Sequence, residues 1–559
     1  MMAVRRAKYG LLLGNDKQVE NPMNGAQALF RALTGAGLDT CFANPGTSEM
    51  QLVYEMGRSD TVRPILCLQE NVVTGAADGY ARMAGKPAFT LLHVGSGFAN
   101  GIANLHNAGR ANTPVVNIVG ANASYHQPNF PEHELIGGKI TELARAVSHW
   151  AREAKSAGEM GLLGAEAASY AMTGSGRIST LIAPTNCHWD PAPDAPVMAA
   201  AMPTPRVAPT TVEATAALLA NGRRTGLLLG AHALRNEGLE LAGRIAAKTG
   251  AQLLGETFPA RLARGEGRVQ VQLVPYFLEL ARQFFAGYEQ IILVGALPPV
   301  STFAYQHSPT HKLPPECETW QFASPDHDVL ASLQDLAEAV GASGETTARG
   351  ERLAPPAPDG PLTGSSIGQS ISLLMPERAI LVDEGATAGM ELYLQTAGAR
   401  QHEYLYAIPG AAIGGGLPVS LGAAVACPDR KVVTLQADGS GMYTNQALWS
   451  IARENCDITI VILKNDAYAV LNVELARVRE GEATPKMQSL LELDEPSIDW
   501  VKLAESMGVP AVAVNSAEDF HAAFEQAMAQ TGPRLIEASI EQNLQPVIDL
   551  ILQSGKAGG

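Results

Sequence analysis

Two oxygen-bearing side chains, Asp438 and Asn465, each follow a strongly apolar stretch of the sequence. Asp438 comes shortly after the stretch 432–436, and Asn465, 27 residues further on, follows the stretch 458–464. Parallel strands bring their carboxyl ends to one edge of a sheet, where open α/β proteins bind ligands. A carboxylate, an amide oxygen and a nearby backbone carbonyl are ligands that Mg²⁺ accepts. The pair therefore predicts a Mg²⁺ site that holds a diphosphate.

Gly439 and Ser440 complete the turn that Asp438 begins. A glycine here would let the backbone approach a phosphate closely, and the helix start that follows would offer free N–H groups. An Asp-Gly-Ser turn by itself is usually only a turn. The spacing to Asn465 and the two apolar stretches favour the binding site instead.

Glu70 and His93 are candidates nearer the N-terminus. Glu70 ends the apolar segment 66–70, and His93 follows the stretch 89–92. A lone glutamate at a strand end is usually a helix N-terminal charge, and a lone histidine there is more often structural. A desolvated carboxyl group at Glu70 could instead stay protonated and act in proton transfer.

The elements that must position these residues alternate between apolar strands and helical stretches. Such alternation predicts parallel sheets covered by helices on both faces. We expect an α/β fold with three doubly wound parallel-sheet domains. They comprise an N-terminal domain at 20–190, a central domain at 205–345 and a C-terminal domain at 366–545, with proline-rich linkers at 183–209 and 346–366.

Composition excludes several classes of function. The 559 residues are 46% hydrophobic and carry a net charge of −16, which fits a large globular protein and argues against a nucleic-acid groove. The six cysteines are scattered without a CxxC pair, so reduced thiols are expected. The uncharged stretch 404–428 is rich in glycine and contains two prolines, and the apolar patch near the N-terminus is too short for a secretory signal. We expect a cytoplasmic protein without membrane helices.

The segment from Asp438 to Asn465 resembles the signature of thiamine-diphosphate-dependent enzymes, Gly-Asp-Gly-Ser followed about 25 residues later by Asn-Asn. The resemblance implies that Asp438 and Asn465 are side-chain ligands of Mg²⁺ and that the Ala467 carbonyl is the backbone ligand. Two positions depart from the signature. Ala437 replaces its first glycine, and Lys464 replaces its first asparagine.

Three stretches of the first domain resemble the pyrimidine-binding domain of the superfamily of 2-oxo-acid decarboxylases and acetolactate synthases, with benzoylformate decarboxylase as the nearest likeness. They are CFANPGTSEM, LQENVVTGAADGYARMAGKPAFTLLH and HVGSGFANGIANLHNA. The resemblance runs from about residue 24 to 545 and is dense in the first and third domains. It implies that Glu70 hydrogen-bonds the aminopyrimidine ring of thiamine diphosphate and helps to remove the C2 proton.

The same resemblance assigns a set of third-domain residues to the cofactor. Ile413 would support its bent form, the Ala411 carbonyl would accept from its 4′-amine, and Thr387 would lie beside it. The cofactor-binding set is completed by Gly439, Ser440 and Tyr468.

Three residues would handle the substrate by the same resemblance. His93 matches the decarboxylase pattern Leu-His-x-x-x-Gly and would relay protons, whereas acetolactate synthases usually carry a small Ser/Thr-Gly-Pro-Gly stretch there. Thr47 would contact the substrate carboxylate through its hydroxyl. His307 would be a second catalytic histidine from the central domain, although its loop is longer here and a surface histidine is nearly as good an interpretation.

Other positions argue against benzoylformate as the substrate. Glu134 and Glu474 stand where the aromatic-acid enzyme has leucine and phenylalanine, and Ala407 replaces another aromatic residue. Either the pocket is more polar, which would favour a substrate with hydrogen-bond donors or positive charge, or the two glutamates are solvated surface charges.

Three hypotheses about function follow. The first is a thiamine-diphosphate- and Mg²⁺-dependent decarboxylase of a 2-oxo acid, without FAD. The second is an acetolactate-synthase-type carboligase, which could hold FAD in its central domain, and the third is a non-catalytic relative. His93 favours the first hypothesis over the second, and Glu70, Asp438 and Asn465 disfavour the third. Because the family places its cofactor between two subunits, a homodimer is expected at minimum, and a homotetramer is common.

Overall fold

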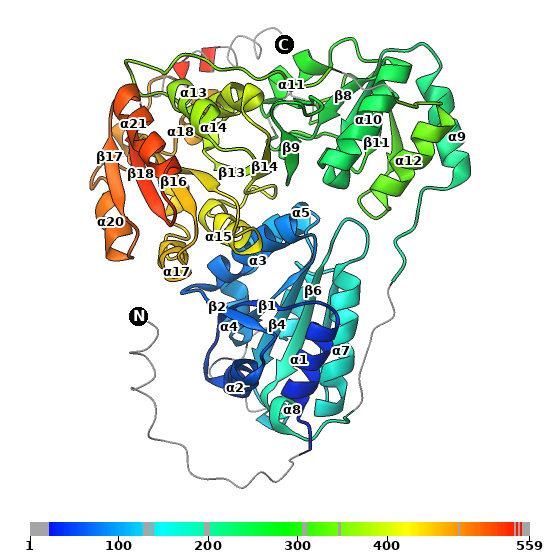
Figure 1. Ribbon diagram of the computed structural model, residues 1–559, viewed down its shortest axis with the longest axis vertical. Helices are drawn as coiled ribbons and strands as arrows, with labels where there is room; N and C mark the ends of the chain where they lie inside the picture. The colour runs from blue at the N-terminus through cyan, green and yellow to red at the C-terminus, as the bar shows by residue number, and fades with distance from the viewer. Residues whose placement is uncertain are drawn as a thin grey trace.

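Three parallel-stranded sheets organise the computed structural model, which describes residues 22–126, 133, 135, 139–194, 202–304, 310–344, 348–478, 481–540, 544–545 and 548–549 (Figure 1). One sheet comes from the N-terminal third of the chain, one from the middle and one mainly from the C-terminal third. The α/β class and the three doubly wound sheets predicted from the sequence are confirmed.

The first sheet has the strand order β2-β1-β3-β4-β6-β5, and all neighbouring strands are parallel. Its strands are β1 (Thr40–Asn44), β2 (Arg63–Leu66), β3 (Ala88–Leu92), β4 (Val115–Ala121), β5 (Trp150–Glu153) and β6 (Ile178–Pro184). One face packs against α1 (Gly25–Gly35), α2 (Met50–Arg58) and α7 (Ala157–Ala171). The other face packs against α3 (Glu70–Ala84), α5 (Ile102–Arg110) and α6 (Ile140–Arg145).

The central sheet has the order β10-β8-β7-β11-β12, again all parallel. Its strands are β7 (Thr225–Leu229), β8 (Gln252–Gly255), β10 (Gln272–Leu273), β11 (Gln290–Val294) and β12 (Glu318–Ala323). The helices α9 (Pro209–Leu219), α10 (Asn236–Thr249) and α12 (Val329–Ala339) cover one face, and α11 (Leu278–Phe285) covers the other.

The third sheet has the order β17-β18-β16-β15-β13-β14-β9. Its own strands are β13 (Ala379–Glu384), β14 (His402–Tyr406), β15 (Val432–Ala437), β16 (Ile458–Lys464), β17 (Ala511–Val514) and β18 (Arg534–Ser539). The helices α13 (Gly364–Leu374), α14 (Ala386–Gln395) and α21 (Ala517–Met528) lie on one face. The helices α15 (Gly416–Ala426), α17 (Ala447–Arg453) and α20 (Trp500–Ser506) lie on the other.

Strand β9 (Leu262–Arg264) differs from the sequence-based division of the chain. It comes from the central segment, yet it pairs antiparallel with β14 at the edge of the third sheet. The pairing covers the backbone groups of β14 that an edge strand would otherwise expose.

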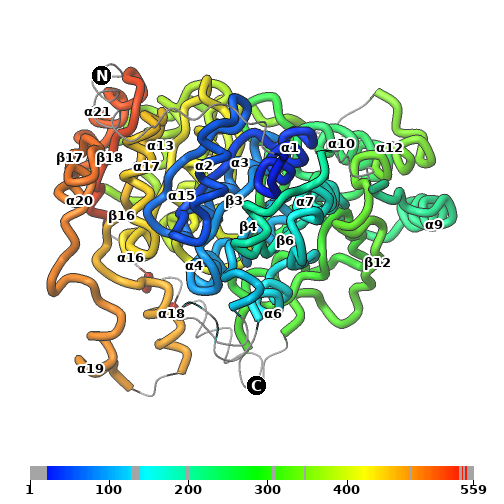
Figure 2. The backbone as a smooth tube through the Cα atoms, turned by 90° about the horizontal axis from the view of Figure 1, so that it is seen from below, coloured from blue at the N-terminus to red at the C-terminus, as the bar shows by residue number. Residues whose placement is uncertain are grey.

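The first and third domains are joined by the crossing of α3 and α15, which lie side by side in both views (Figures 1 and 2). Two glycines allow the close approach. A Cβ atom on Gly79 would overlap the Val419 carbonyl, and one on Gly422 would overlap the Ala76 carbonyl. Apolar side chains of both helices belong to one continuous core.

The linker at 183–209, the cysteines and the helix lengths can each be compared with what the sequence predicts. The proposed linker at 183–209 is only partly irregular, because β6 extends to Pro184 and a short helix, α8 (Thr185–Trp189), follows it. All six cysteines are free. Among the residues that the structure describes, none of the helices combines the length and the apolar character needed to cross a membrane.

Candidate active site

The carboxyl ends of β13 and β15 mark the switch point of the third sheet. β13 has β14 on one side and β15 on the other, so the chain leaves these two strands in opposite directions. Open α/β sheets bind ligands in the crevice at such a point. The segment after β13 leads to Thr387, and the segment after β15 begins with Asp438, which places two predicted cofactor residues at this crevice.

Asp438 is almost fully buried at the end of β15. Its carboxylate accepts from the backbone N–H groups of Gly439 (2.8 Å), Asn465 (3.1 Å) and Asp466 (2.8 Å). Burial raises the pKa of Asp438, against the lowering effect of these three bonds. The predicted pair Asp438 and Asn465 is therefore brought together, with Ala467 two residues further along.

The two departures from the signature are accommodated in different ways. Lys464 lies 3.6 Å from Asp466 and 3.7 Å from Glu537, so two carboxylates balance its charge. Ala437 is the residue before the one-turn helix α16 (Asp438–Gly441), and its carbonyl accepts from the Ser440 hydroxyl at 3.2 Å.

Gly439 is explained by packing in this structure. A Cβ atom on it would lie 2.6 Å from Cε1 of Tyr468 and 2.9 Å from Cδ1 of Leu493. The absence of a side chain on Gly439 thus makes room for the Tyr468 ring. The backbone N–H of Gly439, which the sequence predicts to lie near a phosphate, donates to Asp438 in this structure.

A cavity of about 1290 Å³ opens between the third and central domains. Thr387, Ala411, Ile413 and Ser440 all line it. This volume exceeds the roughly 300–1,000 Å³ of a typical single-ligand pocket, so it has room for a cofactor together with a substrate. Its aromatic lining includes Phe258, Tyr276, Phe277, Phe303, Tyr393 and Tyr406.

Glu384 supports the loop that carries Ala411 and Ile413. This buried carboxylate, at the end of β13, accepts from the N–H groups of Gly414 (2.6 Å) and Gly416 (2.5 Å). Burial raises the pKa of Glu384 despite these bonds. Glu384 was not predicted from the sequence as a site residue, although it lies at the carboxyl end of an apolar strand, as Asp438 does.

The first domain gathers Glu70 and His93 beside Gly97. A Cβ atom on Gly97 would lie 2.8 Å from Oε1 of Glu70 and 3.2 Å from Cβ of His93. Glu70 is the first residue of α3 and is only 8% exposed, and Asn100 donates to its Oε2 at 3.2 Å. Glu70 is thus a buried carboxyl group at the start of a helix, with the Asn100 amide as a side-chain donor.

Glu49 is a residue that the sequence analysis did not single out. It lies in the 3-10 helix η2 (Thr47–Glu49) and is fully buried. Nδ1 of His93 donates to its Oε2 at 2.7 Å, and the Gly46 N–H donates to the same oxygen at 2.8 Å. Because Nδ1 is engaged in this way, Nε2 is the ring nitrogen that can face a substrate. Thr47 is exposed at the start of η2 and lies at the same edge of the first sheet as His93, because β1 and β3 are parallel neighbours.

Backbone strain marks several candidate positions. Val94, Ala386, Ala411 and Asp466 have φ angles between 38° and 60°. A left-handed conformation is costly for any residue with a side chain and persists only where the surroundings enforce it, commonly at functional sites. Each of the four is, or directly adjoins, a residue that the sequence analysis assigned to the site: His93, Thr387, Ala411 and Asn465.

One chain does not bring all the candidates to one place. The residues lining the cavity come from the central and third domains and include none of Glu70, His93 and Thr47. The predicted residues His307 and Glu134 lie outside the described part of the chain.

Glu474, for which the sequence allows either a pocket position or a solvated surface charge, is part of an ion-pair cluster. Oε1 of this residue lies 3.4 Å from Nε of Arg477, which also forms a two-point ion pair with Glu279 at 2.6 and 3.1 Å. Glu474 therefore shares the cation Arg477 with Glu279, and it is not among the residues that line the cavity. Ala407 is buried, and its carbonyl accepts from Arg82 at 3.4 Å.

The donor set fits a hard cation better than a transition metal. Among the described residues, no three His, Cys, Asp or Glu side chains group as a metal site. A cation beside Asp438 would therefore depend on amide and carbonyl oxygens, which Mg²⁺ accepts and softer metals do not prefer.

Comparison with known proteins agrees with this geometry. The profile described as "Thiamine pyrophosphate enzyme, N-terminal TPP binding domain" matches residues 23–143, and the one described as "Thiamine pyrophosphate enzyme, C-terminal TPP binding domain" matches residues 389–538. A Mycobacterium tuberculosis protein named "Putative acetolactate synthase large subunit IlvX" is 44% identical over 93% of this chain and 99% of its own length. Benzoylformate decarboxylase of Pseudomonas aeruginosa is 29% identical over 93% of this chain and 99% of its own length.

Among solved structures, the thiamine diphosphate-dependent 4-hydroxybenzoylformate decarboxylase of Rhodococcus jostii RHA1 superposes with a TM-score of 0.80 at 25% identity. It covers 93% of this chain and 100% of that one. Together with the nearly full-length relative at 44% identity, these matches show that the chain belongs to the thiamine pyrophosphate enzyme family, which has decarboxylase and acetolactate synthase members.

Proposed function

We propose that this chain is a thiamine-diphosphate- and Mg²⁺-dependent decarboxylase of a 2-oxo acid. The observation that carries the proposal is the pair Glu49–His93 next to Glu70. An imidazole that is oriented through Nδ1 and has Nε2 available can deliver a proton to a reaction product. A decarboxylase must protonate the carbon that has lost CO₂, whereas a carboligase joins that carbon to a second carbonyl group and protonates the oxygen of that group instead.

The cofactor, when bound, supplies the electron sink that makes the bond between the 2-oxo carbon and the carboxylate cleavable. Glu70 would hydrogen-bond its aminopyrimidine ring, and Ala411 and Ile413 would orient it from the third domain. Asp438, Asn465 and the Ala467 carbonyl would hold Mg²⁺ at the diphosphate. Thr47 would bind the substrate carboxylate, and His93 would hold the proton that is delivered.

A homodimer is the minimum active unit in this proposal. Glu70, His93 and Thr47 do not line the cavity that contains Ala411 and Ile413 of the same chain. A second copy would supply the first-domain residues to that cavity, and a homotetramer would pair two such dimers.

The carboligase function is a real second candidate, because the relative that is 44% identical carries an acetolactate synthase name. In that case the same residues would bind the cofactor, the carbon that has lost CO₂ would add to a second 2-oxo acid, and the proton would go to the oxygen of the newly formed hydroxyl group. FAD in the central domain would accompany this function in the acetolactate-synthase pattern, and we do not expect it here.

The test is purification without added flavin, followed by assays with aromatic, aliphatic and polar 2-oxo acids in which CO₂, aldehyde and acyloin products are all measured. We expect CO₂ and aldehyde in equal amounts and no bound flavin. His93→Ala should lower aldehyde release by about 100-fold or more. A stoichiometric flavin, with 2-acetolactate as the main product from pyruvate, would establish the carboligase function instead.

A further inference from the structure

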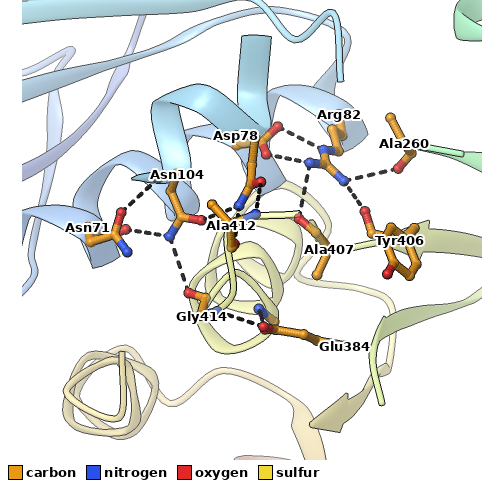
Figure 3. Close-up of polar contacts among 12 residues, drawn as sticks. Asn71, Asp78, Arg82, Asn104, Ala260, Glu384, Tyr406, Ala407, Ala412 and Gly414 are labelled. Carbon is orange, nitrogen blue, oxygen red and sulfur yellow. Dashed lines mark hydrogen bonds and ion pairs between the residues drawn. The ribbon is translucent and has the colours of Figure 1, made fainter. Parts of the chain in front are cut away.

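Two buried asparagines of the first domain, Asn104 and Asn107, reach the loop of the third domain that carries Ala411 and Ile413, and a third, Asn71, bonds to Asn104. Asn71, Asn104 and Asn107 are 6%, 1% and 0% exposed. Asn71 is the second residue of α3, directly after Glu70, and the other two lie on α5. Figure 3 shows Asn71 and Asn104 on one side of this contact and Ala412, Gly414 and Glu384 on the other.

Asn107 satisfies both backbone groups of Ala412. Its Nδ2 donates to the Ala412 carbonyl at 2.7 Å, and its Oδ1 accepts from the Ala412 N–H at 3.2 Å. The remaining Nδ2 hydrogen goes to Oδ1 of Asn104 at 2.9 Å. The amide of Asn107 is thus used at both ends, which no apolar side chain could reproduce.

This contact determines which way the loop faces. Ala412 points its backbone groups at α5, whereas its neighbours Ala411 and Ile413 both line the cavity. Ala411 is in a left-handed conformation (φ 60°), which is unfavourable for a residue with a side chain unless its surroundings compensate. The two hydrogen bonds between Asn107 and Ala412 compensate for this conformation. They therefore hold Ala411 in the orientation in which it lines the cavity.

Asn104 extends the contact back to the start of α3. Its Nδ2 donates to the carbonyls of Asn71 (2.9 Å) and Gly414 (3.2 Å), and its backbone N–H donates to Oδ1 of Asn71 (2.8 Å). The loop beside the cavity and the residue that follows Glu70 are therefore parts of one buried hydrogen-bond network. Such a network is rigid only while every member is satisfied.

We propose that Asn107, supported by Asn104, is a positioning residue for cofactor binding: it fixes the loop that presents Ala411 and Ile413 by anchoring it to α5 and to the start of α3 of the same chain. This inference rests on the proposed cofactor site but is independent of whether the product is an aldehyde or a ligated acid.

The test compares the wild type with Asn107→Ala, Asn107→Asp and the control Asn117→Ala. Asn117 is a fully buried asparagine of the same domain that hydrogen-bonds Thr90 (2.8 Å) and Thr180 (3.0 Å), away from the loop. Thiamine diphosphate affinity is measured by titration with saturating MgCl₂, the C2–H exchange of the bound cofactor by NMR, and folding by thermal unfolding.

Asn107→Ala should weaken thiamine diphosphate binding by about 10-fold or more and slow C2–H exchange in the saturated protein. Asn107→Asp, which still accepts from the Ala412 N–H but places an acceptor oxygen against the Ala412 carbonyl and Oδ1 of Asn104, should lose at least as much affinity. Asn117→Ala should lower the unfolding temperature while leaving affinity within about two-fold of the wild type. Wild-type affinity and exchange in a less stable Asn107→Ala protein would overturn the inference and leave a structural role. A wild type that binds no thiamine diphosphate would overturn the proposed function itself.

Discussion

Nδ1 of His93 lies 2.7 Å from the buried carboxylate of Glu49, although 44 residues separate them in the sequence. The two meet because His93 directly follows β3, Glu49 lies just beyond β1, and these strands are neighbours in the first sheet. A fully buried carboxylate that receives an imidazole N–H fixes both the orientation and the tautomer of the ring. Glu49 therefore determines which nitrogen of His93 is left available for the proposed substrate.

Glu49→Gln should reduce kcat by about 10-fold or more, with a smaller effect on KM, because a neutral amide holds the imidazole less firmly and can direct its N–H groups at the ring. Steady-state kinetics on the best 2-oxo acid measures this. Glu55→Gln is the matched control, since Glu55 is another buried carboxylate of this domain, bound to Asn24 and Gln27. Equal kinetics in the two variants would remove Glu49 from the mechanism.

Glu70→Gln should slow C2–H exchange of bound thiamine diphosphate by about 100-fold or more, because an amide cannot pass a proton as a carboxyl group can. The rate is read from deuterium incorporation by NMR at saturating cofactor and Mg²⁺. Glu55→Gln again serves as the control. Exchange at the wild-type rate would mean that another group activates the cofactor.

Asp438→Ala should weaken thiamine diphosphate binding at least about 100-fold and abolish its dependence on Mg²⁺, while the circular dichroism spectrum is retained. Asp457→Asn is the control, because Asp457 lies at the opposite end of β16, paired with Lys431 at 2.5 Å. Unchanged cofactor affinity in Asp438→Ala would disprove the assignment of the cation site.

Lys312 gives a prediction about stability. Lys312 is 3% exposed, and its ammonium group donates to the Thr257 hydroxyl (3.1 Å) and the Pro275 carbonyl (2.9 Å). Desolvation lowers the pKa of Lys312 from 10.5 to about 8. The unfolded state therefore binds more protons than the folded state between pH 8 and 10.5, and the group costs about 3 kcal/mol of stability at pH 7.

Raising the pH from 8 to 10.5 should remove this cost, so the free energy of unfolding of the wild type should rise relative to that of Lys312→Met over this interval. Denaturant unfolding of both proteins at several pH values gives the difference between their free energies of unfolding. Groups that titrate alike in the two proteins do not contribute to this difference. A difference that is constant between pH 7 and 10.5 would show that the ammonium group is not desolvated.

The parts of the site that follow strands directly could be predicted from the sequence. Asp438 and Asn465 follow the long apolar runs of β15 and β16, and the register of these neighbouring strands places them together. His93 and Glu70 were found in the same way. In each case the apolar pattern identifies the strand, and the parallel arrangement then fixes which end of it can bind a ligand.

Contacts between domains could not be predicted in this way. Asn107 and Ala412 are 305 residues apart, and nothing in the apolar pattern of α5 indicates that its polar face is buried against another domain. The pairing of Arg477 with Glu279 is a similar case, because it joins α18 (Ala469–Val478) to α11 of the central domain. Glu474 belongs to the same ion-pair cluster, 3.4 Å from Arg477, and the presence of Glu279 in that cluster follows from the packing of the two domains.

The crossing of α3 and α15 also bears on how the chain folds. Because the two helices touch backbone to backbone at Gly79 and Gly422, and share one apolar core, neither domain has a complete interior without the other. A fragment ending before residue 364 would leave the apolar surface of α3 in water. The first and third domains should therefore unfold in a single cooperative transition, and Gly79→Val, which places a branched side chain against the Val419 carbonyl, should destabilise both together.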